Sequence, residues 1–173
     1  LHFRGPGRSG FNEMFDRSQR VEQEMRLDLG LEQLQARFQH LPRAHAPLDL
    51  PFPGHDVRVE ILRHEPAPGV SVLLVREDAA FDRARLYGTP DGDYWDNAGR
   101  YALFCRAVLA SLTALGEHPD VIHAHDWQTA LLPLYLRQRP DFAGPLAGTP
   151  SLLTVHNLAY QGVFPASAMA YTG

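Results

Sequence analysis

Hydrophobic positions change their period several times along the chain, and each change predicts a different element. From about residue 17 to residue 41, apolar side chains recur at steps of three and four, the period of an amphipathic helix. The stripe consists of Leu27, Leu31, Leu34, Phe38 and Leu41. We interpret it as a surface helix packed on a core. A dimer seam is the alternative, although the stripe is shorter than the ~3–4 heptads of a coiled coil.

The next stretch predicts strands followed by a long helix. Residues 42–54 carry several prolines and predict a linker, whereas residues 57–62 and 70–76 are rich in branched apolar side chains and predict two strands joined by a turn. Residues 81–94 are typical of a loop. Residues 96–115 predict a helix, with Asp93 or Asp96 as its cap and Gly116 at its end.

The last third of the chain has the pattern of a strand–helix–strand unit. Continuous apolar runs at residues 121–125 and 151–155 flank a helix predicted from Trp127 to about Arg137. Continuous rather than alternating runs favour a parallel sheet that is covered on both faces. We therefore predict an α/β fold with a Rossmann-like, doubly wound parallel sheet from residue 57 onward.

Two polar clusters follow the two predicted parallel strands. His125, Asp126 and Trp127 come at the end of the first strand, and His156 and Asn157 come at the end of the second. Ligands of open α/β sheets bind beyond the carboxyl ends of the strands. We therefore expect both clusters to share one rim of the sheet and to form a binding site there.

Each of these residues also has an interpretation that involves no ligand. Asp126 is a natural N-cap for the following helix. His123 and His125 fit core or supporting positions, Trp127 fits packing, and His156 fits an ordinary loop histidine. Capping alone does not account for two polar clusters at one rim, so the functional interpretation is the stronger one.

A metal site is the main rival for the histidine-rich strand. We expect His123 and His125 to point to opposite faces of that strand, which disfavours shared coordination. The sequence contains no His-Glu-x-x-His motif, no cysteine pair, no glycine-rich phosphate loop and no Gly-x-Ser-x-Gly motif. Cys105, the single cysteine, fits an inert core thiol and excludes a disulfide framework.

Composition narrows the class of protein further. The chain has 173 residues, a formal net charge of -4 and a sequence pI of about 6.1, so neither nucleic acid nor an anionic membrane is an expected partner. No apolar run approaches the ~20 residues that span a bilayer, and no signal peptide is recognisable. We expect a cytoplasmic protein. Because the chain begins with Leu1 rather than Met, we expect a fragment or a mis-assigned start.

Four blocks of sequence, in the same order, resemble bacterial glycogen synthases and plant starch synthases. They are residues 85–88 (RLYG), 93–104 (DYWDNAGRYALF), 119–129 (PDVIHAHDWQT) and 153–164 (LTVHNLAYQGVF). The resemblance extends from about residue 57 to residue 173. It implies that residues 1–47 are a poorly assigned lead-in with a helix and that residues 48–173 are part of the N-terminal catalytic domain.

This resemblance implies a GT-B glycosyltransferase, in which two Rossmann-like domains face a deep cleft. The family transfers glucose from ADP-glucose to the non-reducing end of an α-1,4-glucan in glycogen biosynthesis, and it retains the anomeric configuration. It uses no cofactor and no metal. The implied partners are ADP-glucose and the glucan.

The resemblance also assigns roles to residues. His156 matches a histidine that lies against the transferred glucose, and Asp126 matches an aspartate that is important for turnover. Four further positions match substrate-binding residues of the cleft: Trp127, Asn157, Tyr94 and Asn97. Such side chains suit an oxocarbenium-like centre in a closed cleft, where oriented dipoles and a carboxylate stabilise developing charge.

Two departures from the family pattern affect the expected activity. The Lys-x-Gly-Gly loop of the family is missing, and so is the C-terminal domain with the cations that bind the diphosphate. We therefore expect the chain to be inactive alone. A non-catalytic module that binds glucan or a partner protein, and a transferase that uses another sugar nucleotide, remain alternatives.

Overall fold

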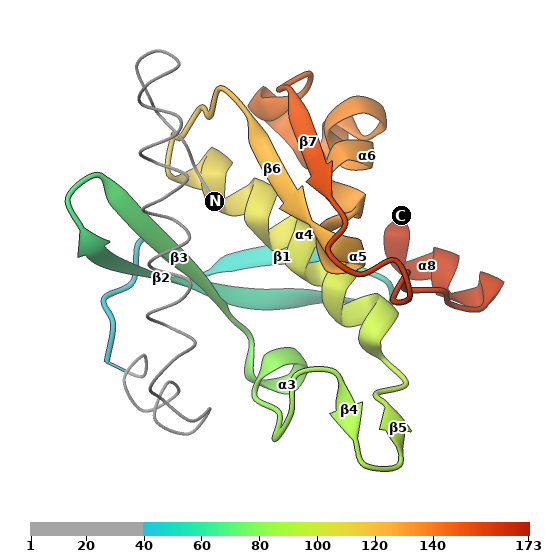
Figure 1. Cartoon of the computed structure of the whole chain (residues 1–173). Helices are drawn as coiled ribbons and strands as arrows, with labels where there is room; N and C mark the ends of the chain where they lie inside the picture. Colours follow the sequence, from blue (N-terminus) through green and yellow to red (C-terminus); the bar gives the residue numbers. More distant parts are fainter. Residues whose placement is uncertain (1–39) are drawn as a thin grey trace.

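The computed structural model describes residues 40–173 (Figure 1). The helix predicted over residues 17–41 lies outside the described residues, apart from its last two positions. Within the described part, two small sheets lie on either side of one long helix (Figure 1).

The first sheet is an antiparallel meander in the order β1–β2–β3. Its strands are β1 (Leu48–Phe52), β2 (His55–Ala67) and β3 (Val70–Arg76). The two predicted strands are confirmed, and β2 extends beyond its predicted range at both ends. The linker prediction missed β1 because of the prolines around it. Pro51 is tolerated there because β1 is an edge strand, where a missing N–H need not break the ladder.

The connection from β3 to the long helix contains short elements where a plain loop was predicted. They are the one-turn helix α3 (Asp78–Phe81) and the hairpin of β4 (Gly88–Thr89) with β5 (Gly92–Asp93). The Glu77 carboxylate caps α3 by accepting a hydrogen bond of 2.6 Å from the backbone N of Ala80.

The long helix α4 (Asn97–Ala114) confirms the helix predicted over residues 96–115. Gly116 has a φ of 64°, and the following Glu117 N donates to the Leu112 carbonyl, so the predicted glycine at the helix end is confirmed. At the other end, the Asp96 carboxylate does not cap the helix. It forms an ion pair of 2.7 Å with Arg83 instead.

Helix α4 separates two hydrophobic cores. Leu103 and Ala107 belong to the core shared with the antiparallel sheet, which also contains Val59 and Ile61. Other positions on α4 belong to the core shared with the second sheet and its helices. These are Cys105, Leu109 and Leu112, which cluster with Ile122, Ala124, Leu132, Tyr135 and Leu136.

The second sheet consists of β6 (Ile122–His125) and β7 (Ser151–Thr154), which pair in parallel. Between them run α5 (Asp126–Thr129), α6 (Leu131–Gln138), α7 (Pro140–Ala143) and η1 (Gly144–Leu146). The strand–helix–strand unit is therefore confirmed, but the predicted single helix is broken at Ala130. Pro133 explains the break, because it has no N–H for a helical bond and its ring clashes with the carbonyl of Thr129.

The fold-class prediction needs correction. In the described residues the parallel sheet has two strands and the larger sheet is antiparallel, so a doubly wound Rossmann sheet is not seen. The antiparallel meander was missed because short apolar runs do not reveal strand direction. The described chain ends in η2 (Ala166–Ala168) and α8 (Met169–Thr172). None of its helices is long and apolar enough to cross a membrane.

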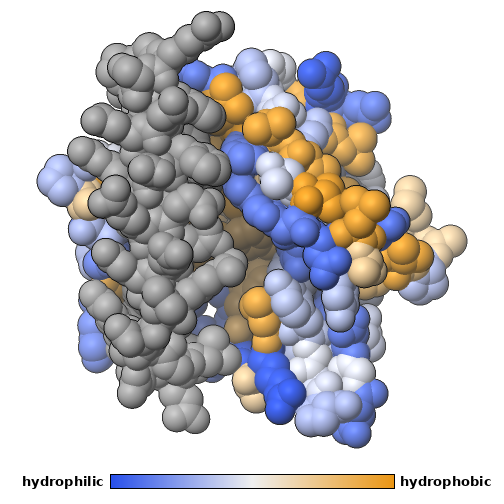
Figure 2. All heavy atoms as spheres, in the orientation of Figure 1, coloured by the Kyte–Doolittle hydropathy of each residue, from blue (hydrophilic) through white to orange (hydrophobic). Residues whose placement is uncertain are grey.

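The prediction that the parallel strands are covered on both faces is wrong for β7. Leu152 and Leu153 are 51% and 40% exposed, and successive strand residues point to opposite faces. Hydrophobic surface accordingly gathers over β7 and the segment that follows it (Figure 2). By contrast, Ile122 and Ala124 of β6 are buried.

Candidate functional site

The carboxyl ends of β6 and β7 lie side by side. His125 is the register partner of Thr154, so the residues that follow both strands emerge at one rim. There the Asp126 carboxylate accepts a hydrogen bond of 2.7 Å from the backbone N of His156. The expected convergence of the two polar clusters is confirmed.

Asp126 has an unusual backbone conformation. Its φ of 58° lies in the left-handed region, and it is the only non-glycine residue of the described chain with a positive φ. Aspartate tolerates this conformation better than most residues, and such outliers concentrate at functional sites. Its carboxylate points across to His156 rather than to the start of α5, whose cap position is His125. The N-cap interpretation of Asp126 is therefore wrong.

Three imidazole rings line up at this rim. The ring centroids of His123 and His125 are 4.1 Å apart, and those of His125 and His156 are 5.3 Å apart with nearly parallel planes. His125 Nδ1 lies 3.0 Å from His156 Nε2, so one nitrogen donates and the other accepts. Our expectation that His123 and His125 diverge is wrong, because side chains two positions apart on a strand share a face.

His123 lies at one end of this row of rings, next to His125. Its Nε2 is 2.7 Å from the hydroxyl of Thr154 on the neighbouring strand. Burial lowers the pKa of His123, and the nearby His156 lowers it further. Both effects favour the neutral form of the ring. Among the described residues, no group of three or more His, Cys, Asp or Glu is arranged to hold a metal ion.

Trp127 packs between α4 and the segment after β7. Its ring centroid lies 4.8 Å from that of Tyr101 in an edge-to-face contact and 5.3 Å from that of Phe164. The packing interpretation of Trp127 therefore has direct support, and its contact with a ligand stays a prediction. Burial raises the pKa of Tyr101 to about 12.

The remaining predicted site residues occupy two places. Asn157 follows His156 at the rim, is exposed, and its Oδ1 accepts a hydrogen bond of 3.0 Å from Ala159 N. Tyr94 and Asn97 form a second group around Arg100, whose guanidinium carbon lies 5.2 Å from the Tyr94 ring centre.

Asn97 is almost fully buried in this second group. Its Nδ2 donates to the Tyr87 carbonyl at 2.8 Å, and its Oδ1 accepts from Arg100 at 2.6 Å. Both ends of its amide thus support the loop before α4. The ring of Tyr87 contacts that of Tyr101, which in turn contacts Trp127, so a row of aromatic rings connects the second group to the rim.

Cys105 does not take part in the site. It is fully buried, burial raises the pKa of its thiol to about 12, and its Sγ donates to the Gln128 carbonyl at 3.4 Å. This agrees with the predicted inert core thiol.

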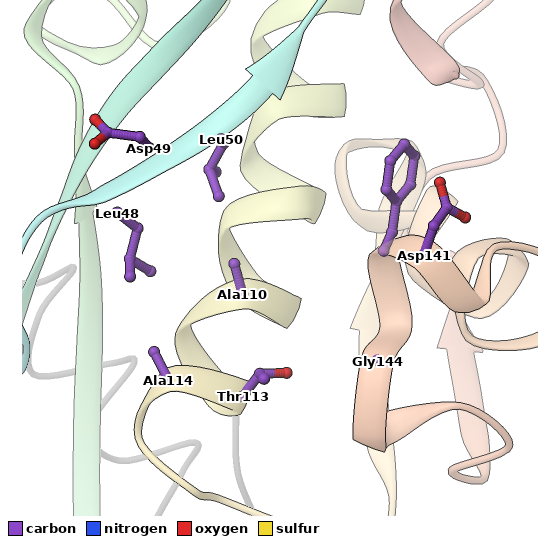
Figure 3. Close-up of a pocket in the computed structure, with 9 residues that line it drawn as sticks. Leu48, Asp49, Leu50, Ala110, Thr113, Ala114, Asp141 and Gly144 are labelled. Atoms are coloured by element: carbon purple, nitrogen blue, oxygen red, sulfur yellow. The ribbon is translucent and has the colours of Figure 1, made fainter.

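A cavity of about 340 Å³ lies elsewhere, between β1, α4 and α7 (Figure 3). Its walls are mostly apolar, and its two carboxylates already have cationic partners: Asp49 lies 3.8 Å from Arg58, and Asp141 lies 2.7 Å from Arg139. None of the predicted site residues lines it, so we place the candidate site at the rim.

His125 was expected at the rim, but two contacts there were not predicted from the sequence. Thr154 contacts His123, and Gly162 packs against Trp127. Because alternate residues of a strand share a face, the spacing of His123 and His125 could have predicted that their rings lie side by side. Nothing local in the sequence shows which ring Gly162 approaches.

Comparisons with known proteins identify similar sequences and structures. The family described as the starch synthase catalytic domain matches residues 21–173 and so begins well before residue 48. Glycogen synthase 2 from Geobacter sulfurreducens is 52% identical over 112 residues, which cover 65% of this chain and 23% of that protein. Glycogen synthase 2 from Geobacter metallireducens is 47% identical over 120 residues, 69% of this chain and 25% of that protein.

A solved structure is also similar. It is the catalytic domain of Starch Synthase IV from Arabidopsis thaliana bound to ADP and acarbose, with a TM-score of 0.59 and 29% identity. The match covers 75% of this chain and 26% of that one. The chain therefore spans about a quarter of the length of the relatives it matches. On these matches, the chain belongs to the starch synthase catalytic domain family.

Proposed function

We propose that the chain is part of a glycogen (starch) synthase and supplies one wall of a GT-B cleft. The reaction is the retaining transfer of glucose from ADP-glucose to the non-reducing end of an α-1,4-glucan. The observation that carries this proposal is the 2.7 Å hydrogen bond between Asp126 and His156, at one rim of a parallel strand pair within the matched segment.

The rim residues suit a developing positive charge on the sugar. Asp126 is fixed by its bond to the His156 backbone, so its carboxylate needs little reorganisation when an oxocarbenium-like centre forms nearby. The His156 imidazole and the Asn157 amide are exposed and orient sugar hydroxyls. Trp127, Tyr94 and Asn97 line or support the same wall. His156 orients a hydroxyl without changing its protonation state.

The nucleotide is bound mainly by residues outside this chain. The similar plant structure, with ADP and acarbose bound, supports a nucleotide and a glucan as ligands of the complete enzyme. All 16 basic residues of this chain are arginines, so a lysine for the diphosphate has to come from elsewhere. A diphosphate leaving group without its cations is poorly stabilised, and we expect no glucose transfer by the chain alone.

A second candidate is a module that binds glucan or a partner protein without turnover. The exposed apolar and aromatic side chains after β7 favour this alternative, since exposed hydrophobic patches often bind other molecules. They are Leu158, Tyr160 and Val163, which are 73%, 69% and 87% exposed. Affinity for maltoheptaose without any transfer, under all of the conditions below, would favour this module.

Transfer of radioactive glucose from ADP-glucose to glycogen tests the proposal. The chain is assayed alone and together with a second polypeptide that supplies the rest of Geobacter sulfurreducens glycogen synthase 2. We expect transfer only when both polypeptides are present. Transfer by the chain alone, or preference for another sugar nucleotide, would contradict the corresponding part of the proposal.

Variants of the rim make the same assay specific to the site. Asp126→Asn and His156→Ala should lower transfer about 10²–10³-fold, the usual effect of removing one preorganised electrostatic group. Asp120→Asn and His118→Gln change exposed residues of the loop before β6 and serve as matched controls. Equal activity of all four variants would show that the rim is not the site.

A further inference from the structure

The segment that carries His156 and Asn157 has little structure of its own. Residues 155–165 contain no helix or strand and pass α5 on the way to α8 (Figure 1). Beyond His156 the hydrogen bonds of this segment are local: Tyr160 N donates to the Asn157 carbonyl, and Gln161 Nε2 donates to the Leu158 carbonyl. These bonds form a turn, but they do not attach the turn to the rest of the protein.

Besides the contact of His125 with the His156 ring, two neighbouring residues of α5 attach the segment. Asp126 holds the start of the segment through the backbone N of His156. Trp127 holds its far end, where a Cβ built on Gly162 would lie 2.6 to 2.7 Å from three carbon atoms of the indole. The backbone of Gly162 thus rests directly on the indole, at a distance that leaves no room for a side chain.

Gly162 is required for two independent reasons. Its φ of 62° lies in the left-handed region, where side chains are disfavoured. The contact with Trp127 adds a steric requirement that this backbone conformation alone does not impose. Gly116 separates the two effects, because it has nearly the same φ, 64°, and nothing within 4 Å of its built Cβ.

Helix α4 also contacts the indole, through Tyr101. The edge-to-face contact with Tyr101 fixes the ring, and the Tyr101 hydroxyl is itself bonded to the Leu86 carbonyl at 3.4 Å. Phe164 contacts the same indole just beyond Gly162. Trp127 therefore lies between the rigid helix and the segment that carries His156.

From these contacts we propose that Trp127 is a positioning residue. Its indole seats Gly162 and keeps the segment of residues 156–162 closed onto α5, so that His156 and Asn157 stay at the rim beside Asp126. This role is distinct from a direct contact of the indole with sugar. Its consequence for glucose transfer rests on the proposed function, whereas the seating of the segment does not.

A double-mutant cycle on the full chain tests the seating. Gly162→Ala, Trp127→Leu and the double variant are compared by hydrogen exchange of the backbone amides of residues 157–162, with Gly116→Ala as the matched glycine control. We expect Gly162→Ala to speed this exchange about tenfold, which corresponds to the middle of the range of interaction energies measured between residues in direct contact. Gly116→Ala should leave the exchange rate unchanged. In the Trp127→Leu background, Gly162→Ala should increase the exchange rate much less, because the indole that it displaces is already absent.

Equal effects of Gly162→Ala in both backgrounds, or exchange that matches the Gly116→Ala control, would overturn the proposal. Fluorescence gives a second readout, because the chain has two tryptophans and Trp95 is 87% exposed. In a Trp95→Phe background the emission of Trp127 should shift to the red when Gly162→Ala is added. An unchanged emission would contradict the seating even if the variants differ in stability.

Transfer in the two-polypeptide assay then separates the seating from the proposed function. If the function is right, Gly162→Ala should lower kcat more than it raises KM, because it displaces groups that act in the transition state. A change confined to KM would argue for direct sugar contact at this end of the segment and against positioning. If no variant or wild-type chain supports transfer, the exchange and fluorescence results still decide the seating.

Discussion

The two sides of α4 differ in what they bury and in what they expose. Towards the antiparallel sheet, Val59 and Ile61 are fully buried against Leu103 and Ala107. At the parallel pair only β6 is covered, and β7 leaves Leu152 and Leu153 about half exposed. The polar groups of the rim lie on this less covered side. The candidate chemistry thus lies beside the less covered of the two sheets.

Two buried arginines of α4 tie distant segments of the chain to this helix. Arg106 is almost fully buried and donates to the Pro51 carbonyl at 2.7 Å, with the Phe142 ring 4.2 Å from its guanidinium carbon. Arg100 is buried in the same way and donates to the Ala80 carbonyl at 2.6 Å. Both cations are thus satisfied largely by backbone carbonyls and aromatic faces, which ties distant segments to α4.

Substitution of one leucine on each side of α4 should give the largest difference in unfolding free energy. Leu103→Ala empties a buried position of the core that α4 shares with the antiparallel sheet and should cost about 2–5 kcal/mol of unfolding free energy. Leu152→Ala on β7 should cost less than about 0.5 kcal/mol, because its side chain is already half in water. Urea unfolding followed by circular dichroism measures both. Similar losses in the two variants would show that β7 is covered in solution.

A smaller effect concerns the pH dependence of the rim. The pKa of His123 is lowered on folding, so the unfolded chain binds more protons and stability falls as the pH drops below about 6.5. His125, His156 and Asp126 are the titratable neighbours of this ring at the rim. His123→Gln should remove part of this pH dependence, by an amount well below the effect of Leu103→Ala, since the His123 ring keeps contact with solvent.

Unfolding midpoints at pH 7 and pH 5 measure the difference. His118→Gln, on the exposed loop before β6, is the matched control and should keep the wild-type dependence. If His123→Gln and His118→Gln respond to pH alike, the neutral state of His123 does not contribute to stability.

Local patterns predicted the elements around the site well. The β6–α5–β7 unit follows from two apolar runs and the residues between them, and the meeting of Asp126 with His156 follows from parallel pairing alone. The long helix α4 was equally clear, because its apolar period and its terminal Gly116 agree.

What the sequence did not reveal depends on contacts between distant segments. The direction of β1, β2 and β3 is set by their tight turns and by packing on α4, and a strand pattern alone does not encode it. The hydrogen bond between Asp126 and His156 joins positions 30 residues apart, and the contact of Gly162 with Trp127 joins positions that lie farther apart still. Helix capping was the local alternative for Asp126, and the tertiary bond to His156 outweighed it.

The central claim is that the Asp126 carboxylate holds the backbone of His156 at the rim. The most direct test is the hydrogen exchange of a single amide, that of His156, in the wild-type chain, Asp126→Asn and Asp126→Ala. We expect the exchange to quicken about tenfold in the alanine variant and less in the asparagine variant, which keeps a neutral acceptor. Asp120→Ala should leave it unchanged. If the His156 amide exchanges at the wild-type rate in both Asp126 variants, the two residues do not form one site.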